Sequence, residues 1–157
     1  MLAASQGLAS LAVLLVGVIY GTDVFSAVVL RPAMAALGDR ELTQAAGRIH
    51  KYGDQRLPLP GTAGTVAAAA AAICAGFADH GGEAALAGIA FAALLAWLGL
   101  YLRIAAPINR RMTAAAREHR TPVDIRAMQK RWDSIITARA ALQGGALALL
   151  IAALVMS

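Results

Sequence analysis

Residues 84–120 read AALAGIAFAALLAWLGLYLRIAAPINRRMTAAAREHR. The first half of this stretch carries no charge and is about as long as a helix that crosses the hydrocarbon core of a bilayer, about 20 residues. The second half carries five arginines. A sharp change from apolar to basic sequence is typical of a membrane helix that ends in a cytoplasmic loop. The stretch therefore predicts one membrane span followed by a cytoplasmic segment.

The rest of the chain repeats this pattern. Three more apolar runs cover residues 7–30, 61–78 and 134–156, and 59% of all residues are hydrophobic. We expect one domain, an all-α integral membrane four-helix bundle with spans at about 7–31, 58–78, 84–106 and 133–156. A soluble domain of 157 residues could not bury four such runs.

The basic residues predict the topology. All of them except Arg139 lie between the first and second runs or between the third and fourth: Arg31, Arg40, Arg48, Lys51, Arg56, Arg103, Arg110, Arg111, Arg117, Arg120, Arg126, Lys130 and Arg131. Positive charge marks the cytoplasmic side, so both basic loops should be cytoplasmic and both termini outside. We expect a bacterial inner membrane protein. The net charge of +5 is explained by topology, and no nucleic-acid partner is expected.

Both cytoplasmic loops are predicted to hold amphipathic helices at the membrane interface. In residues 39–55, Ala45, Ile49 and Tyr52 recur at helical spacing. In the second loop, Thr121-Pro122 is a favourable helix start. The bilayer is therefore an expected partner of these segments as well as of the spans.

Small residues predict close helix packing. Gly17 and Gly21 form a small-xxx-small motif in the first span, and residues 67–72 are all alanine. Such segments let helices approach closely, within one chain or between copies, so a homo-oligomer is an open alternative. The single cysteine, Cys74, can form no intramolecular disulfide.

Two ionisable residues fall inside the predicted spans. Asp23 lies nine residues before Pro32, and Arg139 lies seven residues after Trp132. At 1.5 Å per residue both sit roughly 10 to 13 Å from the same membrane face. Because an unpaired charge in hydrocarbon is costly, we expect Asp23 and Arg139 to face each other inside the bundle. The pair either lines a pocket or only fixes the helix register.

Further polar and aromatic residues are candidates for the same region. Trp132, Arg139 and Gln143 share one helix face at spacings i, i+7 and i+11. Tyr20 lies one turn from Asp23. Arg103 near the cytoplasmic side is either part of the site or a side chain that extends to the lipid headgroups.

His50 is the most reactive side chain in the first basic loop. Asp54 follows it at i+4 and could orient its imidazole as a base or a metal ligand. One histidine with one carboxylate is a weak metal signal, because protein metal sites generally use three or four ligands. Haem ligation needs one or two histidines and stays open. The simpler alternative is a surface histidine.

Several of these pieces together resemble a known family. The first helix ends in Arg31-Pro32, the third in residues 106–112 (APINRRM), and the fourth opens with residues 131–133 (RWD). This combination resembles the anthrone oxygenase-like family of small four-helix membrane proteins, catalogued as domain of unknown function 1772. The resemblance spans nearly the whole chain.

The resemblance implies oxidation of anthrones to anthraquinones with dioxygen and without a classical cofactor. It places Asn109, Trp132 and Arg139 at family motif positions, whereas Asp23 and His50 come from the residue patterns alone. The first hypothesis is a membrane oxygenase acting on a small apolar aromatic or quinone-type substrate. Asp23 or His50 would be its base, and Arg139 with Asn109 would hold the oxyanion. The alternatives are a haem- or metal-binding redox protein that uses His50, and a non-catalytic packing or accessory subunit.

Overall fold

A computed structural model describes residues 1–156 of the chain. All the regular secondary structure of these residues is helical: α1 (Leu2–Phe25), η1 (Ser26–Leu30), α2 (Arg31–Ala35), α3 (Asp39–Arg56), α4 (Pro58–Gly76), α5 (Gly81–Leu100), η2 (Tyr101–Ala105), α6 (Ala106–Arg117) and α7 (Ile125–Met156). The short segments η1 and η2 are π-helical and continue α1 and α5 without a break.

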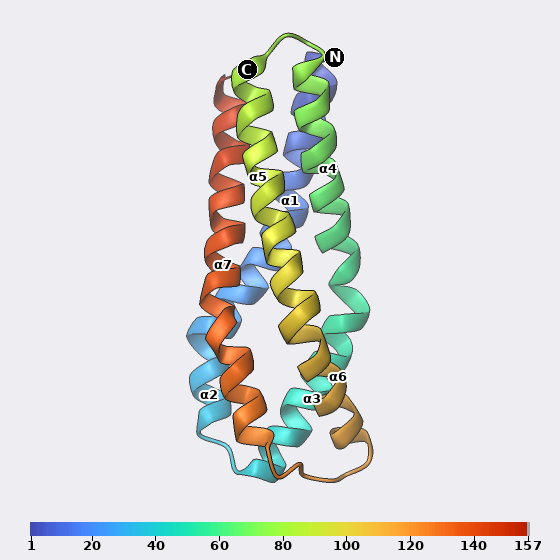
Figure 1. Ribbon diagram of the computed structural model, residues 1–157, viewed down its shortest axis with the longest axis vertical. Helices are drawn as coiled ribbons and strands as arrows, with labels where there is room; N and C mark the ends of the chain where they lie inside the picture. The colour runs from blue at the N-terminus through green and yellow to red at the C-terminus, as the bar shows by residue number, and fades with distance from the viewer. Residues whose placement is uncertain (157) are drawn as a thin grey trace.

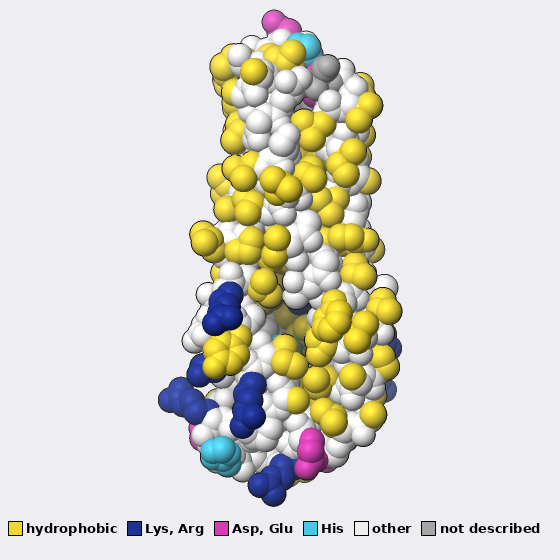
Figure 2. Space-filling model, turned by 180° about the vertical axis from the view of Figure 1, so that it is seen from behind, with side chains coloured by type: hydrophobic (Ala, Val, Ile, Leu, Met, Phe, Trp, Pro, Cys, Tyr) yellow, Lys and Arg dark blue, Asp and Glu magenta, His cyan; other side chains and the backbone are white. Residues whose placement is uncertain are grey.

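Four rods run along the long axis of the molecule (Figure 1). They are Leu2–Ala35, Pro58–Gly76, Gly81–Arg117 and Ile125–Met156, and each is long and apolar enough to cross a membrane. The described chain therefore confirms the predicted all-helical architecture and indicates an integral membrane protein. Both chain ends lie at one end of the bundle (Figure 1), and Lys and Arg side chains gather at the opposite end (Figure 2).

The half of the bundle near the chain ends has a core of small side chains. α1 packs against α4 and α7, and α5 packs against the same two helices from the other side. Alanines contributed by several helices lie at the contacts, with Leu94 and Leu150 filling the remaining space. Alanine presents almost no side chain, so the backbones approach closely and the helices stay nearly parallel.

The basic half has a second core made of larger side chains. Leu42 of α3, Met112 of α6, and Ile125 and Ile136 of α7 are fully buried there. α3 packs mainly against α6. The helices extend beyond the predicted span limits at this end, because α6 continues to Arg117 and α7 already begins at Ile125. The bundle therefore continues past the length that a bilayer covers.

The two apolar faces of α3 have different surroundings. Leu42 and Ala46 face the core, whereas Ile49 and Tyr52 are exposed. The predicted face of Ala45, Ile49 and Tyr52 is thus not the one that packs inside the protein.

Gly47 allows α3 and α6 to touch. A Cβ atom at this position would lie 2.5 Å from the Met112 carbonyl oxygen and would also overlap the Cβ of Ala116. We expect Gly47→Ala to destabilise the fold by about 1 to 3 kcal/mol, because backbone must move to relieve the overlap. Gly53→Ala on the same helix is the matched control, since its Cβ would meet only Leu57 Cδ1 at 3.8 Å. Thermal unfolding in detergent compares the two. Equal midpoints would contradict the close contact.

Each π-helical segment lies two residues before a proline. η1 ends at Leu30 before Pro32, and η2 ends at Ala105 before Pro107. Proline has no N–H to donate to the preceding turn, and its ring crowds the carbonyl four residues earlier. A wider π turn relieves this crowding, and such segments are frequent at functional sites.

The Cβ positions of Gly17 and Gly21 face open space in the bundle. Cβ atoms added at either position would meet no atom of the described residues within 4 Å. The close packing that this motif predicts is therefore not used between the helices of one copy. Packing between two copies through this motif stays a prediction.

Candidate functional site

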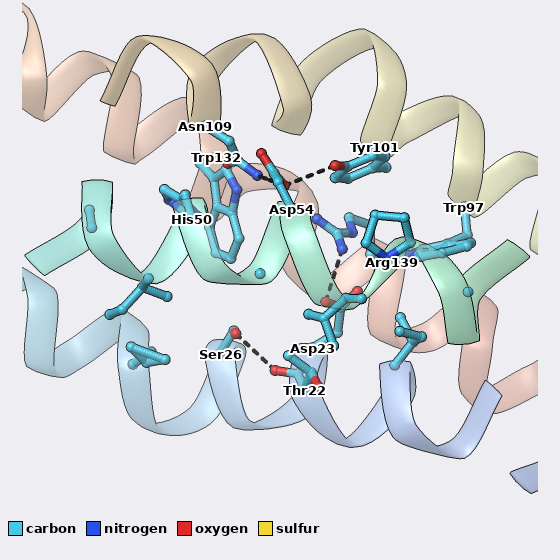
Figure 3. Close-up of a pocket in the computed structure, with 18 of the residues that line it drawn as sticks. Thr22, Asp23, Ser26, His50, Asp54, Trp97, Tyr101, Asn109, Trp132 and Arg139 are labelled. Atoms are coloured by element: carbon cyan, nitrogen blue, oxygen red, sulfur yellow. Dashed lines mark hydrogen bonds and ion pairs between the residues drawn. The ribbon is translucent and has the colours of Figure 1, made fainter. Parts of the chain in front are cut away.

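A cavity of about 250 Å³ lies between the two cores. Its walls come from α1, η1, α2, α3, α4, α5, η2, α6 and α7, and most of the lining is apolar. Figure 3 shows the polar side chains that face this space. Small-molecule sites usually enclose about 300 to 1,000 Å³ and are mostly apolar with a few polar groups. The cavity therefore fits a small apolar molecule.

Asp23 and Arg139 form a buried ion pair in the wall of the cavity. Arg139 Nη2 donates to Asp23 Oδ1 at 2.9 Å, and Gln143 Nε2 donates to Asp23 Oδ2 at 2.8 Å. Only 3% of Asp23 and 6% of Arg139 are exposed. The prediction that the two charges face each other is confirmed. Both carboxylate oxygens of Asp23 are occupied, so this residue acts as an anchor for the guanidinium.

Aromatic rings surround the Arg139 guanidinium. Its Cζ lies 5.6 Å from the Tyr101 ring centroid and 5.9 Å from that of Trp132, which is cation–π geometry. Arg139 Nε is buried and has no hydrogen-bonding partner within the described chain. The same holds for the buried indole Nε1 of Trp132. Two N–H donors that belong to cavity-lining residues therefore have no acceptor among the described residues.

Asp54 holds a second polar cluster on the other side of the cavity. Tyr101 Oη and Asn109 Nδ2 donate to Asp54 Oδ1 at 2.8 and 2.9 Å. These bonds tie the end of α3 to η2 and α6 (Figure 3). The cluster fixes the Asn109 amide in the wall.

His50 faces the cavity from α3. Its ring packs against Trp132 with centroids 5.3 Å apart and planes inclined by 45°. The pKa of His50 is lowered from 6.5 to about 4, mainly by burial; the Asp54 carboxylate partly offsets this, and the Arg139 cation contributes to the lowering. The imidazole is therefore neutral at pH 7, with a nitrogen able to accept a proton. The link between His50 and Asp54 predicted from their spacing is electrostatic in the structure, where Asp54 accepts hydrogen bonds from Tyr101 and Asn109.

The predicted site residues fall into two groups. One group lines the cavity: Asp23, His50, Asn109, Trp132 and Arg139. The other group does not line it: Gln143, Tyr20 and Arg103. Gln143 lies behind Asp23, Tyr20 packs beside Gly144, and Arg103 is exposed on the surface. Direct contact with a substrate is thus a prediction for the first group only.

The sequence interpretation missed Trp97 and Gln129, which also line the cavity. The Trp97 indole is directed at Asp23 but does not reach hydrogen-bond geometry with any described residue. Gln129 Nε2 donates to Asp133 Oδ1 at 2.9 Å. The sequence offered a signal for Trp97. The chain has only two tryptophans, and the other one, Trp132, was already a predicted site residue.

Few side chains in the described lining could bind a haem or a metal ion. His50 is the only histidine among the described lining residues, and its ring already packs against Trp132. Across residues 1–156, three or more His, Cys, Asp or Glu side chains nowhere gather in a way that could hold a metal ion.

The class of this protein is assigned from its fold and its cavity. No protein-family model, curated protein or solved structure matches the chain. The fold defines a four-helix protein of the integral membrane class with a polar cluster inside an apolar cavity.

Proposed function

We propose that the protein is a membrane-embedded oxygenase that acts on a small apolar aromatic or quinone-type substrate. One observation carries the proposal: a neutral imidazole, that of His50, and a buried cation with a free N–H, that of Arg139, line the same small apolar cavity. The first can remove a proton from carbon, and the second can hold the oxygen on which the negative charge develops.

The chemistry requires a substrate whose CH₂ group is acidified by a ring carbonyl, as in an anthrone. His50 takes one proton from this carbon, and Arg139 Nε with Trp132 Nε1 stabilises the enolate oxygen. Because the substrate and the imidazole both start neutral, this step leaves the net charge of the cavity unchanged.

Dioxygen is the oxidant in the next steps. The enolate gives one electron to dioxygen, and the resulting carbon radical and superoxide combine to form a carbon–oxygen bond. The imidazolium returns its proton to the peroxide. Loss of the second hydrogen from the same carbon then breaks the oxygen–oxygen bond and releases water. In total, CH₂ and O₂ become C=O and H₂O.

Two carboxylates support the reacting groups in this proposal. Of the two bases that the sequence left open, His50 is favoured, because both oxygens of Asp23 accept hydrogen bonds. Asp23 positions Arg139, and Asp54 positions Asn109 and Tyr101.

The orientation in the membrane is part of the same proposal. The basic end would face the cytoplasm of a bacterial cell, and both termini would lie outside the inner membrane. The exposed face of α3 with Ile49 and Tyr52 would rest at the membrane interface.

Oxygen consumption by the detergent-purified protein tests the function, with anthrone as the probe. We expect anthrone-dependent oxygen uptake with anthraquinone formed in equal amount, above the spontaneous rate with heat-denatured protein. An absorption spectrum and metal analysis of the same sample test the alternatives. A Soret band or a stoichiometric metal would favour the redox protein. Absence of turnover with anthrone and with related ring ketones would favour a packing subunit.

A further inference from the structure

The cavity has a mouth on the side of the bundle. Figure 2 shows a hollow in one face of the molecule, at the level where the Lys and Arg side chains begin. Lining residues from two separate walls are also partly or fully exposed: Leu30 and Arg31 on one side, and Ile49 and Gly53 of α3 on the other.

The two ends of the cavity are closed by the two cores. Toward the chain ends, Ala12, Ala90 and Leu150 are fully buried. Toward the basic end, Leu42 and Ile125 are fully buried as well. A molecule in the cytoplasm would have to open the basic-end core to reach the cavity along the axis, whereas the side mouth needs no such opening.

The surface around the mouth is suited to lipid. On η1, the segment that contains the lining residue Leu30, Val28 is 68% exposed, and the lining residue Ile49 of α3 is 41% exposed. Next to Gly53, the Tyr52 ring carries Lys51 Nζ at 5.4 Å and Arg56 Cζ at 5.2 Å from its centroid. Exposed aliphatic side chains beside an aromatic ring and cations are typical of the layer between the acyl chains and the anionic headgroups.

We propose that this mouth is a lateral portal through which an apolar substrate enters from the cytoplasmic leaflet of the membrane. η1 forms one side of the portal and the Ile49–Gly53 turn of α3 forms the other. The identity of the molecule that passes through the portal rests on the proposed function, whereas the position of the portal does not. Membrane solubility concentrates such a molecule in the bilayer, so a route from lipid raises its local concentration.

The chain contains its own reporters for a test. Its two tryptophans, Trp97 and Trp132, both line the cavity, so a quinone that reaches the cavity quenches all the tryptophan fluorescence. The probe is 2-decyl-1,4-naphthoquinone, and the protein is reconstituted in vesicles of phosphatidylethanolamine and phosphatidylglycerol. Stopped-flow mixing measures the rate of quenching.

Gly53→Phe places a ring in the mouth. A Cβ at Gly53 meets only Leu57 Cδ1 at 3.8 Å, so the backbone accommodates it. We expect quenching to slow by roughly tenfold or more, a barrier increase of about 1.4 kcal/mol. Gly99→Phe is the control, because a Cβ there would meet no atom of the described residues within 4 Å. Ile49→Phe is the second blocking variant if Gly53→Phe does not fold.

Two results would overturn the portal. One is a quenching rate that is the same in the folded blocking variant and in Gly99→Phe. The other is a rate that follows the aqueous quinone concentration, and not its mole fraction in the bilayer, when the amount of lipid is varied. The readout is binding, so a protein that fails to oxidise anthrone still answers the question. If the protein does not oxidise anthrone but the blocking variant still slows quenching, the portal is supported and the oxygenase proposal is excluded.

Discussion

Replacing Arg139 by glutamine is expected to destabilise the protein by about 3 to 5 kcal/mol and to abolish oxygen uptake. The loss of stability follows because Asp23 would remain as a charge that is only 3% exposed, with Gln143 as its one remaining partner. Removing one member of a buried ion pair costs about this much. Reversible unfolding in detergent measures the stability, and oxygen uptake with anthrone measures the activity.

The double variant Asp23→Asn with Arg139→Gln separates the two roles of the pair. Two neutral amides can hydrogen-bond in place of the ion pair, so most of the lost stability should return. Activity should not return, because the cation that faces the cavity is still missing. Full activity in the folded double variant would show that the pair only fixes the packing of α1 against α7. Arg103→Gln is the control for loss of an exposed arginine at the surface.

The second large effect is expected from His50. Changing His50 to alanine should lower kcat by about 10² to 10⁴, the usual contribution of a general base. The fold should persist, because His50 is not part of a hydrogen-bonded core. His119→Ala, in the turn after α6, is the matched control and should leave kcat unchanged. A kcat that survives in His50→Ala would exclude this imidazole as the base.

The pH dependence gives an independent signature of His50. Because burial lowers the pKa of His50 to about 4, the base is in its active neutral form at all higher pH values. We expect kcat/KM to rise as the pH passes about 4 and then to stay level through neutral pH. Asp54→Asn should move this rise to lower pH, since the carboxylate of Asp54 raises the pKa of His50. A rise near 6.5 would mean that the imidazole is solvated.

The same pKa affects stability. His50 binds a proton at about pH 6.5 when the chain is unfolded but only near pH 4 when it is folded. Between these values the unfolded state holds more protons, so stability falls as the pH is lowered through this window. This part of the acid sensitivity should be absent in His50→Gln.

The architecture could be predicted from the sequence because the bilayer imposes simple requirements. A run of about 20 apolar residues and a bias in positive charge are enough to place helices. The predicted span limits did not mark the helix ends, because buried protein contacts continue beyond the apolar runs. Met112 and Ile125 lie in segments that look polar, yet both are fully buried between α3, α6 and α7.

The site was partly predictable for the same reason. The depth of Asp23 and Arg139 followed from counting residues, and their high cost in hydrocarbon predicted the contact that joins them. Which groups share the cavity could not be read from spacing. Tyr20 lies one turn from Asp23 but packs beside Gly144, while Trp97 from another helix is directed at the carboxylate. Which side chains meet between two helices depends on how far each helix is rotated about its own axis. An alanine-rich sequence hardly specifies this rotation.

The π-helical segments of α1 and α5 carry a consequence for how this chain tolerates insertions and deletions. A π turn holds an extra residue, and one residue in an α-helix corresponds to a rotation of about 100°. Because the π turn already accommodates that residue, removing one residue from Ser26–Leu30 would leave a straight α-helix whose later side chains keep their present directions. The same deletion in an α-helical part of a rod would turn every later side chain by about 100°. Loss of a single codon is therefore expected to be less damaging in these two short segments than elsewhere in the rods.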